Sequence, residues 1–360
     1  MTIMSARLET SIGEIRLKNP VIAAAAEHLI EEDGILSAIR AGAGAVVVKS
    51  TNESEAAKDQ LRRAEYVALD ENWRPVTWGP AASRSATVFS RSGLTPLSFD
   101  AWLEQNRRAE QVARDHDCLL VPSLILADLD RAVGMARSVA DAGFRVLEFN
   151  IGTPYASQAA KGAVSTELSP ERVASIVRTI RKAVALPLWI KVTGQSERVP
   201  ELAEAAFQSG ADSVVMAGRL LGFLPDLTTR KPVLGTSCGI GGYWNLPLTC
   251  HWLASTRQRL GAARPLIGIN GAASGHDVAR MMLAGASAVG LASAVMMRGF
   301  QVVEQAVGDL CAYCAEAGLS AEDLVGIAAD QRKSFADMPV LDDHWKNFIP
   351  TMSATKEPKS

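Results

Sequence analysis

Four stretches of the chain repeat one pattern of apolar and polar positions. In each, the spacing of an amphipathic helix ends at a small residue and a glycine, and an apolar run follows two or three residues later. The glycines are Gly42, Gly143, Gly210 and Gly285. Glycine suits this place because the residue after the last helical turn often adopts a left-handed conformation. Continuous apolar runs are typical of strands buried on both faces, so the pattern predicts parallel βα units.

Completing this pattern along the chain predicts eight strands. They are expected at residues 20–25, 45–49, 119–124, 146–149, 188–192, 213–216, 266–269 and 288–291. Helical patterns lie between them, and eight such units are the number in a closed barrel rather than an open sheet. The expected fold class is α/β, a (β/α)8 TIM barrel with long loops at its C-terminal face. We expect one domain over residues 1–345, with a hairpin at residues 7–20 that covers the barrel bottom, and a tail over residues 346–360.

The composition excludes several classes of partner. A formal net charge of −2 gives no reason to expect nucleic acid or an anionic membrane surface. The apolar run at residues 21–26 is too short to cross a bilayer. Five scattered cysteines are typical of a cytoplasmic protein rather than a disulfide scaffold. Cys311 and Cys314 have a CxxC spacing, but they fall within a helical pattern and are expected to be core residues. No metal site is expected.

Two connections are too long for simple βα loops, residues 50–98 and residues 217–243. Long loops at the carboxyl ends of barrel strands usually build the active site. Lys49, Asn150 and Lys191 end or directly follow predicted strands at that same face. A lone lysine at a strand end reaches solvent as often as a ligand. Three polar side chains that converge on one barrel mouth favour a ligand.

Small residues follow the last two predicted strands and indicate a phosphate site. Asn270-Gly271-Ala272 forms a turn that a ligand can approach closely, and Ala292-Ser293-Ala294 begins a helix whose free N–H groups favour an anion. Gly239, Gly241 and Gly242 are either a plain flexible loop or backbone that lies against a flat or charged ligand. By itself, this phosphate site is equally consistent with a sugar phosphate.

Six segments, in order and at the same strand ends, resemble the dihydroorotate dehydrogenase family, which includes the FMN domain of dihydropyrimidine dehydrogenase. The resemblance covers roughly residues 8–325. The segments are "KNPVIAAAA", "AGAGAVVVKST", "VLEFNIGTPY", "PLWIKVT", "CGIGG" and "PLIGINGAASGHDVARMMLAGASAVGLASA".

The resemblance implies FMN as cofactor and a role for each matching residue. Lys49 and Lys191 would face the flavin as catalytic cations, and Asn150 would bind both cofactor and substrate. A cation beside the flavin stabilises the negative charge of its reduced form. The other implied cofactor-binding residues are Ala24 and Ala25 against the ring system, and Gly241, Gly242, Asn270, Gly271, Ala292, Ser293 and Ala294 towards the phosphate.

The sequence departs from the family pattern where the substrate is read. Thr153 stands at the position of the catalytic cysteine or serine, and a threonine hydroxyl is a poor base without a partner for its proton. Ser90 and Tyr155 replace ring-reading asparagines, and Arg219 follows the sixth strand, either as an anion clamp or as a surface residue. Gly93 and Leu94 complete the implied substrate loop. Dihydroorotate is therefore expected to be a poor substrate.

These observations predict an FMN-dependent oxidoreductase that acts on a CH–CH bond of a small polar, cyclic substrate. Two alternatives stay open: a genuine dihydroorotate dehydrogenase that uses Thr153 as its base, and a barrel that binds a phosphorylated metabolite without redox chemistry. No NAD fingerprint or iron–sulfur cysteine set is present, so the electron acceptor is unknown and a partner flavoprotein is possible. We expect a homodimer.

Overall fold

The structure, a computed structural model, describes residues 8–152, 169–218 and 220–349. One compact unit ends at Asp330, and residues 331–360 form a second unit. All described side chains of the second unit are exposed, and its elements are two short 3-10 helices, η5 (Phe335–Asp337) and η6 (His344–Phe348).

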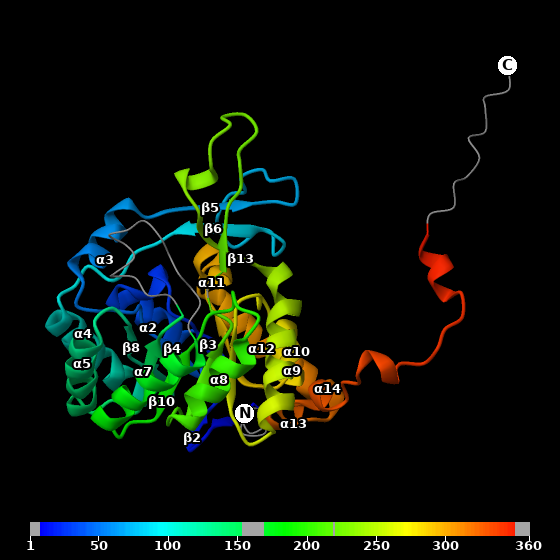
Figure 1. Cartoon of the computed structure of the whole chain (residues 1–360). Coiled ribbons are helices and arrows are strands. Elements are labelled where there is room, and N and C mark those ends of the chain that lie inside the picture. The colour runs from blue at the N-terminus through cyan, green and yellow to red at the C-terminus, as the bar shows by residue number, and fades with distance from the viewer. Residues whose placement is uncertain (1–7, 153–168, 219, 350–360) are drawn as a thin grey trace. The chain divides into compact units, whose positions relative to one another are not determined.

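A parallel sheet of nine strand segments forms the centre of the first unit (Figure 1). Its order is β7-β4-β3-β15-β14-β11-β10-β9-β8. The bounds are β3 (Val21–Ala23), β4 (Ala45–Val47), β7 (Leu119–Val121), β8 (Ser123–Ile125), β9 (Leu147–Asn150), β10 (Leu188–Lys191), β11 (Ser213–Met216), β14 (Leu266–Ile269) and β15 (Ala286–Leu291). The two ends of this order, β7 and β8, are separated by Pro122 alone. They are therefore one interrupted strand, and the sheet closes into an eight-stranded barrel, which confirms the predicted TIM barrel.

Helices surround the barrel and are amphipathic towards it. The longer ones are α2 (Glu32–Arg40), α4 (Phe99–Asp115), α5 (Leu129–Asp141), α7 (Pro170–Ala183), α8 (Val199–Gln208), α9 (Leu246–Leu260), α10 (Gly275–Leu283) and α12 (Gln301–Ala317). The shorter ones are α3 (Glu55–Asp59), α11 (Ser293–Arg298), α13 (Ala321–Leu324) and α14 (Ile327–Asp330), with 3-10 turns η1 (Glu27–Leu29), η2 (Gln60–Arg63), η3 (Val233–Gly235) and η4 (Tyr243–Asn245). The four glycines of the repeated pattern all have positive φ. Cys311 and Cys314 are buried on α12 and are not in disulfides, as predicted for core residues.

The barrel interior is filled from below by the predicted hairpin, β1 (Thr10–Ile12) and β2 (Ile15–Leu17). Ile12 and Leu17 pack into the apolar cluster inside the strands, which also contains the fully buried Trp189. The Thr10 hydroxyl donates to the Ser287 carbonyl of β15 at 2.7 Å and fixes the hairpin to the barrel wall. This end is sealed, so a ligand site belongs at the opposite end.

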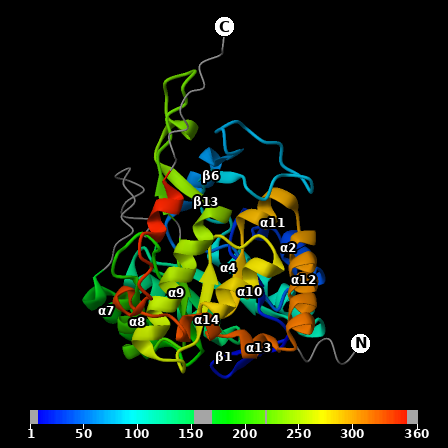
Figure 2. The ribbon, with the colours of Figure 1, turned by 90° about the vertical axis from the view of Figure 1, so that its right-hand side faces the viewer.

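At the carboxyl ends of the strands, the two long connections pair with each other. Each contributes two strands to an antiparallel sheet of order β12-β13-β6-β5. Their bounds are β5 (Glu65–Leu69), β6 (Thr87–Arg91), β12 (Leu220–Gly222) and β13 (Cys238–Gly242). This second sheet, called the roof below, lies over the barrel mouth in both views (Figures 1 and 2). The glycine-rich segment at residues 238–242 is therefore a strand, not a flexible loop.

Candidate functional site

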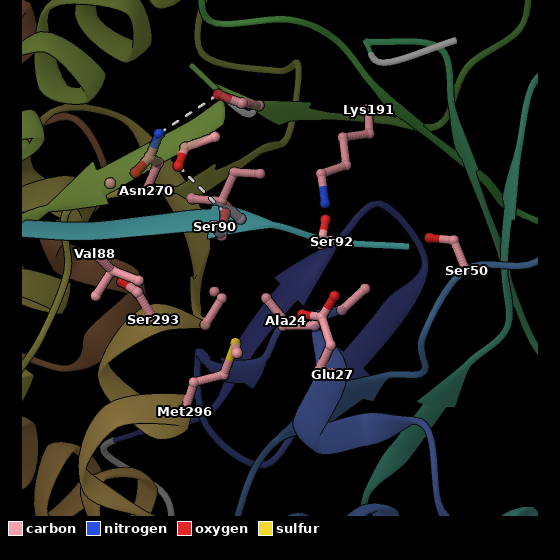
Figure 3. Close-up of a pocket in the computed structure, with 18 of the residues that line it drawn as sticks. Ala24, Glu27, Ser50, Val88, Ser90, Ser92, Lys191, Asn270, Ser293 and Met296 are labelled. Carbon is pink, nitrogen blue, oxygen red and sulfur yellow. Dashed lines mark hydrogen bonds between the residues drawn. The ribbon is translucent and has the colours of Figure 1, made fainter. Parts of the chain in front are cut away.

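A cavity of about 210 Å³ lies between the carboxyl ends of the barrel strands and the roof (Figure 3). Its floor comes from the strand ends and the turns that follow them, and its cover comes from β6 and β13. The predicted site residues that line it are Ala24, Ala25, Lys49, Ser90, Leu94, Asn150, Lys191, Gly241, Asn270, Gly271, Ala292 and Ser293. Residues scattered over most of the chain therefore converge on one cavity.

The remaining predicted residues have other places. Gly242 and Ala294 line a smaller pocket that shares Gly271 and Ser293 with the main cavity. Gly93 lines neither: a Cβ there would lie 2.2 Å from the Leu61 backbone nitrogen, so it permits close packing of the chain. Thr153, Tyr155 and Arg219 lie outside the described residues.

Lys49 is held at the cavity wall by its backbone and by a carboxylate. Its N–H donates to the Leu29 carbonyl at 3.1 Å, and its carbonyl accepts from Nε1 of Trp102 at 3.0 Å. Its Nζ lies 2.8 Å from Oε1 of Glu27, and the two side chains are only 10% and 17% exposed. Glu27 was missed by the sequence reasoning. The sequence feature that could have indicated it is the position of this carboxylate, shortly after the end of the first barrel strand.

Lys191 and Asn150 are partners in register on neighbouring strands, which brings both side chains to the cavity. The ammonium group of Lys191 points into the cavity (Figure 3). Oδ1 of Asn150 accepts from the Gly152 N–H at 3.0 Å, which orients its amide at the start of the following turn. The sequence expectation that these two residues meet at the mouth agrees with this geometry.

A chain of hydroxyl groups connects the cavity with a buried carboxylate. Ser50, which lines the cavity, lies 2.8 Å from the Ser123 hydroxyl, and that hydroxyl donates to Oε1 of Glu148 at 2.7 Å. Glu148 is 2% exposed and lies on the barrel side of β9, because its neighbours Leu147 and Phe149 pack outward. With Glu148 ionised, Ser50 donates to Ser123, so the lone pairs of Ser50 remain available to a group in the cavity.

The turn after β14 forms the wall between the cavity and the smaller pocket. Asn270 and Gly271 have φ of 75° and 114°. A Cβ on Gly271 would lie 2.5 Å from the backbone nitrogen of Leu246, so only glycine fits. The Thr249 hydroxyl donates to the Asn270 carbonyl at 2.7 Å and fixes the turn to α9.

Two arginines that the sequence reasoning missed face the smaller pocket, Arg84 and Arg298. Arg298 is 8% exposed; its Nη2 donates to the Ala273 carbonyl at 2.6 Å, and its buried Nε has no hydrogen-bond partner among the described residues. Burial lowers the pKa of Arg298, Arg84 lowers it further, and Asp277 acts in the opposite direction. Asp277 is itself bound by Arg84 at 3.3 Å and Arg280 at 3.1 Å. Asp277 is thus paired with two arginines, and the buried Arg298 beside them leaves an excess of positive charge, an arrangement suited to an added anion.

Among the described residues, no three His, Cys, Asp or Glu side chains are placed together to hold a metal ion. None of the described helices is long and apolar enough to span a membrane.

The sequence pattern that defines the dihydroorotate dehydrogenase family matches residues 78–313. The chain belongs to this family. It is 26% identical over 324 residues to the catalytic subunit of dihydroorotate dehydrogenase B (NAD(+)) from Methanocaldococcus jannaschii, covering 89% of this chain and 98% of that protein. It is 34% identical over 167 residues to dihydroorotate dehydrogenase A (fumarate) from Lactobacillus helveticus, covering 46% and 53% of the two chains.

The fold is shared with a solved member of the family. The crystal structure of a dihydroorotate dehydrogenase from Eimeria tenella in complex with ferulenol has a TM-score of 0.68 to this chain at 16% sequence identity, and the match covers 91% of this chain and 89% of the other. Members of the dihydroorotate dehydrogenase family are flavin-dependent oxidoreductases that act on CH–CH bonds, and this chain is an oxidoreductase of that type.

Proposed function

We propose that this member of the dihydroorotate dehydrogenase family binds FMN and exchanges hydride with a CH–CH bond of a small polar, cyclic substrate. One observation carries the choice of FMN: the buried Arg298, with an unpartnered Nε, beside a pocket that continues the main cavity. A buried cation without enough anionic partners favours a ligand with a terminal negative group. FMN has a phosphate at one end, which suits the smaller pocket, and a flat ring system at the other, which suits the main cavity.

The residues around the cavity fit FMN. The phosphate would lie in the smaller pocket, against Gly242, Gly271 and the N–H groups at Ala292–Ala294, with Arg298 as its buried cation. The ring system would lie on the small floor residues Ala24 and Ala25. Gly290 lies next to this floor. A Cβ on Gly290 would lie 3.0 Å from the Cβ of Ala24, so the close packing here favours glycine.

FMN, when bound, accepts or supplies the hydride. Lys191 would place a positive charge beside the ring system, where reduction adds negative charge. Lys49 and Asn150 would bind and orient the ligands from the strand ends, together with Ser90 and Leu94 in the cavity and the predicted residues Tyr155 and Arg219.

Removing hydride from one substrate carbon requires removing a proton from its neighbour. Thr153 is the acceptor that the family pattern implies. The hydroxyl chain supports a second route, in which Ser50 takes the proton as its own passes to Ser123 and that of Ser123 passes to Glu148. The carboxylate then ends protonated, so charge and atoms balance.

The electron acceptor is proposed to be a separate molecule or a partner flavoprotein. The name of the Methanocaldococcus jannaschii relative, a catalytic subunit of an NAD(+) enzyme, supports a partner subunit. We also propose a homodimer located in the cytoplasm. The five cysteines, none of which is in a disulfide, support a reducing compartment.

The first prediction is that purified protein contains one non-covalent FMN per chain. Acid precipitation should release the flavin, and its absorbance gives the stoichiometry. Photoreduction should bleach the bound flavin, which a barrel that only binds a phosphorylated metabolite would not show. A colourless protein that fails to bind added FMN would contradict the proposal.

Dihydroorotate is the second candidate substrate, because the relatives described above are named dihydroorotate dehydrogenases. Rapid bleaching of the bound flavin by dihydroorotate would favour a genuine dihydroorotate dehydrogenase over the broader assignment.

A further inference from the structure

We infer that residues 79–85 form a strap that closes the smaller pocket against solvent, and that Arg84 fastens this strap and so sets how fast FMN enters and leaves. The inference rests on the proposed function and adds a route for the cofactor to it. Its basis is the bridge from Arg84, which lines the pocket, to the start of α10.

The smaller pocket meets solvent at two of its lining residues. The side chain of Arg84 is 55% exposed and Tyr243 is 49% exposed, whereas the other lining residues are buried or half-buried. Arg298, the cation proposed to hold the phosphate, is 8% exposed and lies on the inner side. A ligand that moves between the pocket and solvent by the shortest way therefore passes Arg84 and Tyr243.

The strap is fastened at two points, one on each helix that borders the pocket. The Gly79 N–H donates to the Met297 carbonyl of α11 at 2.8 Å, where the connection between β5 and β6 reaches that helix (Figure 2). Nη2 of Arg84 donates to the Ser274 hydroxyl at 2.5 Å and lies 3.3 Å from Oδ2 of Asp277. The strap thus extends from α11 to the start of α10.

The anchor on α10 is firm and the strap is not. Ser274 and Asp277 are 5% and 7% exposed, and Oδ2 of Asp277 also accepts from the Ala273 N–H and the Ser274 hydroxyl, each at 3.0 Å. Residues 79–85, in contrast, are all exposed or half-buried and lie outside the helices and strands. Segments that bury so little surface open at low free energy. When Arg84 lets go, the strap moves and α10 stays.

The strap is also the part of the cover that opens at least cost. The central pair of the roof joins residues 87–90 of β6 to residues 239–242 of β13 in four residue pairs, so opening it breaks a ladder of backbone hydrogen bonds. The strap precedes β6 and is held by the bonds of Gly79 and Arg84. Its apolar contribution is Ala82, which packs at the edge of a small buried cluster.

Arg84→Gln tests the strap, because it removes the ion pair and leaves Arg298 and the N–H groups of the pocket in place. Stopped-flow quenching of flavin fluorescence by apoprotein gives the association rate, and recovery of fluorescence on dilution gives the release rate. Both rates should rise about fivefold, the range for a half-exposed charge pair, and the affinity should change little. Riboflavin, which is uncharged, should show the same increase because it passes the same strap.

Arg280→Gln is the matched control. Arg280 pairs with the same carboxylate at 3.1 Å and is 59% exposed, but it belongs to α10 and lies outside the lining of the pocket. This variant removes one positive charge beside Asp277 without releasing the strap, so both rates should equal those of wild type. Salt provides a second measurement: 0.5 M NaCl should speed release from wild type more than from Arg84→Gln, because the ion pair is screened.

Faster release of FMN from Arg84→Gln at an unchanged association rate, with riboflavin unaffected, would make Arg84 a phosphate ligand and overturn the inference. Unchanged rates for both flavins would overturn it as well. Apoprotein that binds no FMN would contradict the proposed function instead, so the two failures are separate results.

Discussion

Arg298 shows how one buried side chain can depend on a ligand. Its guanidinium is packed at the end of α11, where the Ala273 carbonyl is its one acceptor among the described residues, and a second arginine, Arg84, lies in the same pocket. An isolated protein gains little from such a charge, because burial removes water without supplying a full set of acceptors. A bound phosphate would supply them.

Replacing Arg298 by glutamine should therefore weaken FMN binding by about tenfold to a hundredfold, the range of one charge-assisted hydrogen bond. Riboflavin, which lacks the phosphate, should bind the variant and wild type alike. Fluorescence quenching of each flavin by apoprotein measures both affinities. Arg280→Gln is the control, because Arg280 is 59% exposed and also contacts Asp277. Equal losses for FMN and riboflavin would assign Arg298 a purely structural role.

At the scale of elements, the barrel strands were predictable and the roof was not. The strands β11 and β14 have the predicted bounds, because continuous apolar runs next to a helix-ending glycine have few other interpretations. The strand β13 is the sequence "CGIGG", whose glycines carry little preference for a strand, and its partner β6 comes from the other long connection. Arg84 and Glu27 were missed for the same reason: their neighbours come from distant segments.

The turn at Gly271 provides the test at this scale. Gly271→Ala should destabilise the protein by about 2 kcal/mol and reduce its FMN content, because φ is 114° and the new Cβ meets the Leu246 backbone. Gly134→Ala is the control. A Cβ at Gly134, inside α5, meets nothing within 4 Å, so that variant should gain up to about 1 kcal/mol from helix propensity. Chemical denaturation measures both changes, and a neutral Gly271→Ala variant would contradict the strained turn.

At the scale of the whole chain, folding stability belongs to the unit that ends at Asp330. That unit contains the closed barrel and the outer helices, and its last segment is joined to α9 by the ion pair of Arg257 with Asp330 at 2.7 Å. In the described part of the second unit even Phe335 and Val340 are 96% and 84% exposed. Residues that bury so little apolar surface contribute little to stability.

A chain that ends after Lys333 should thus have a free energy of unfolding within about 0.5 kcal/mol of the full chain, the range of surface changes. It should also keep its FMN. A chain that ends after Gly318 is the opposite control, because it lacks the buried Leu324 and the Asp330 carboxylate. Thermal denaturation of the three proteins decides the point. A clear loss in the first truncation would give residues 334–360 a stabilising role.

The roof has a consequence for how specificity can be exchanged between relatives. Its central pair joins β6 from one long connection to β13 from the other, with Ser90 opposite Gly239 and its hydroxyl bound to the Gly239 carbonyl. Each connection pairs its own two strands, β5 with β6 and β12 with β13, but the central pair that joins the two halves of the roof needs both connections. A chimera that receives one connection from a relative would contain β6 or β13 without its matching partner strand. A chimera that receives both connections would keep the pair and thus an intact roof over the cavity. Substrate preference in this architecture is therefore transplanted as a matched pair of distant segments.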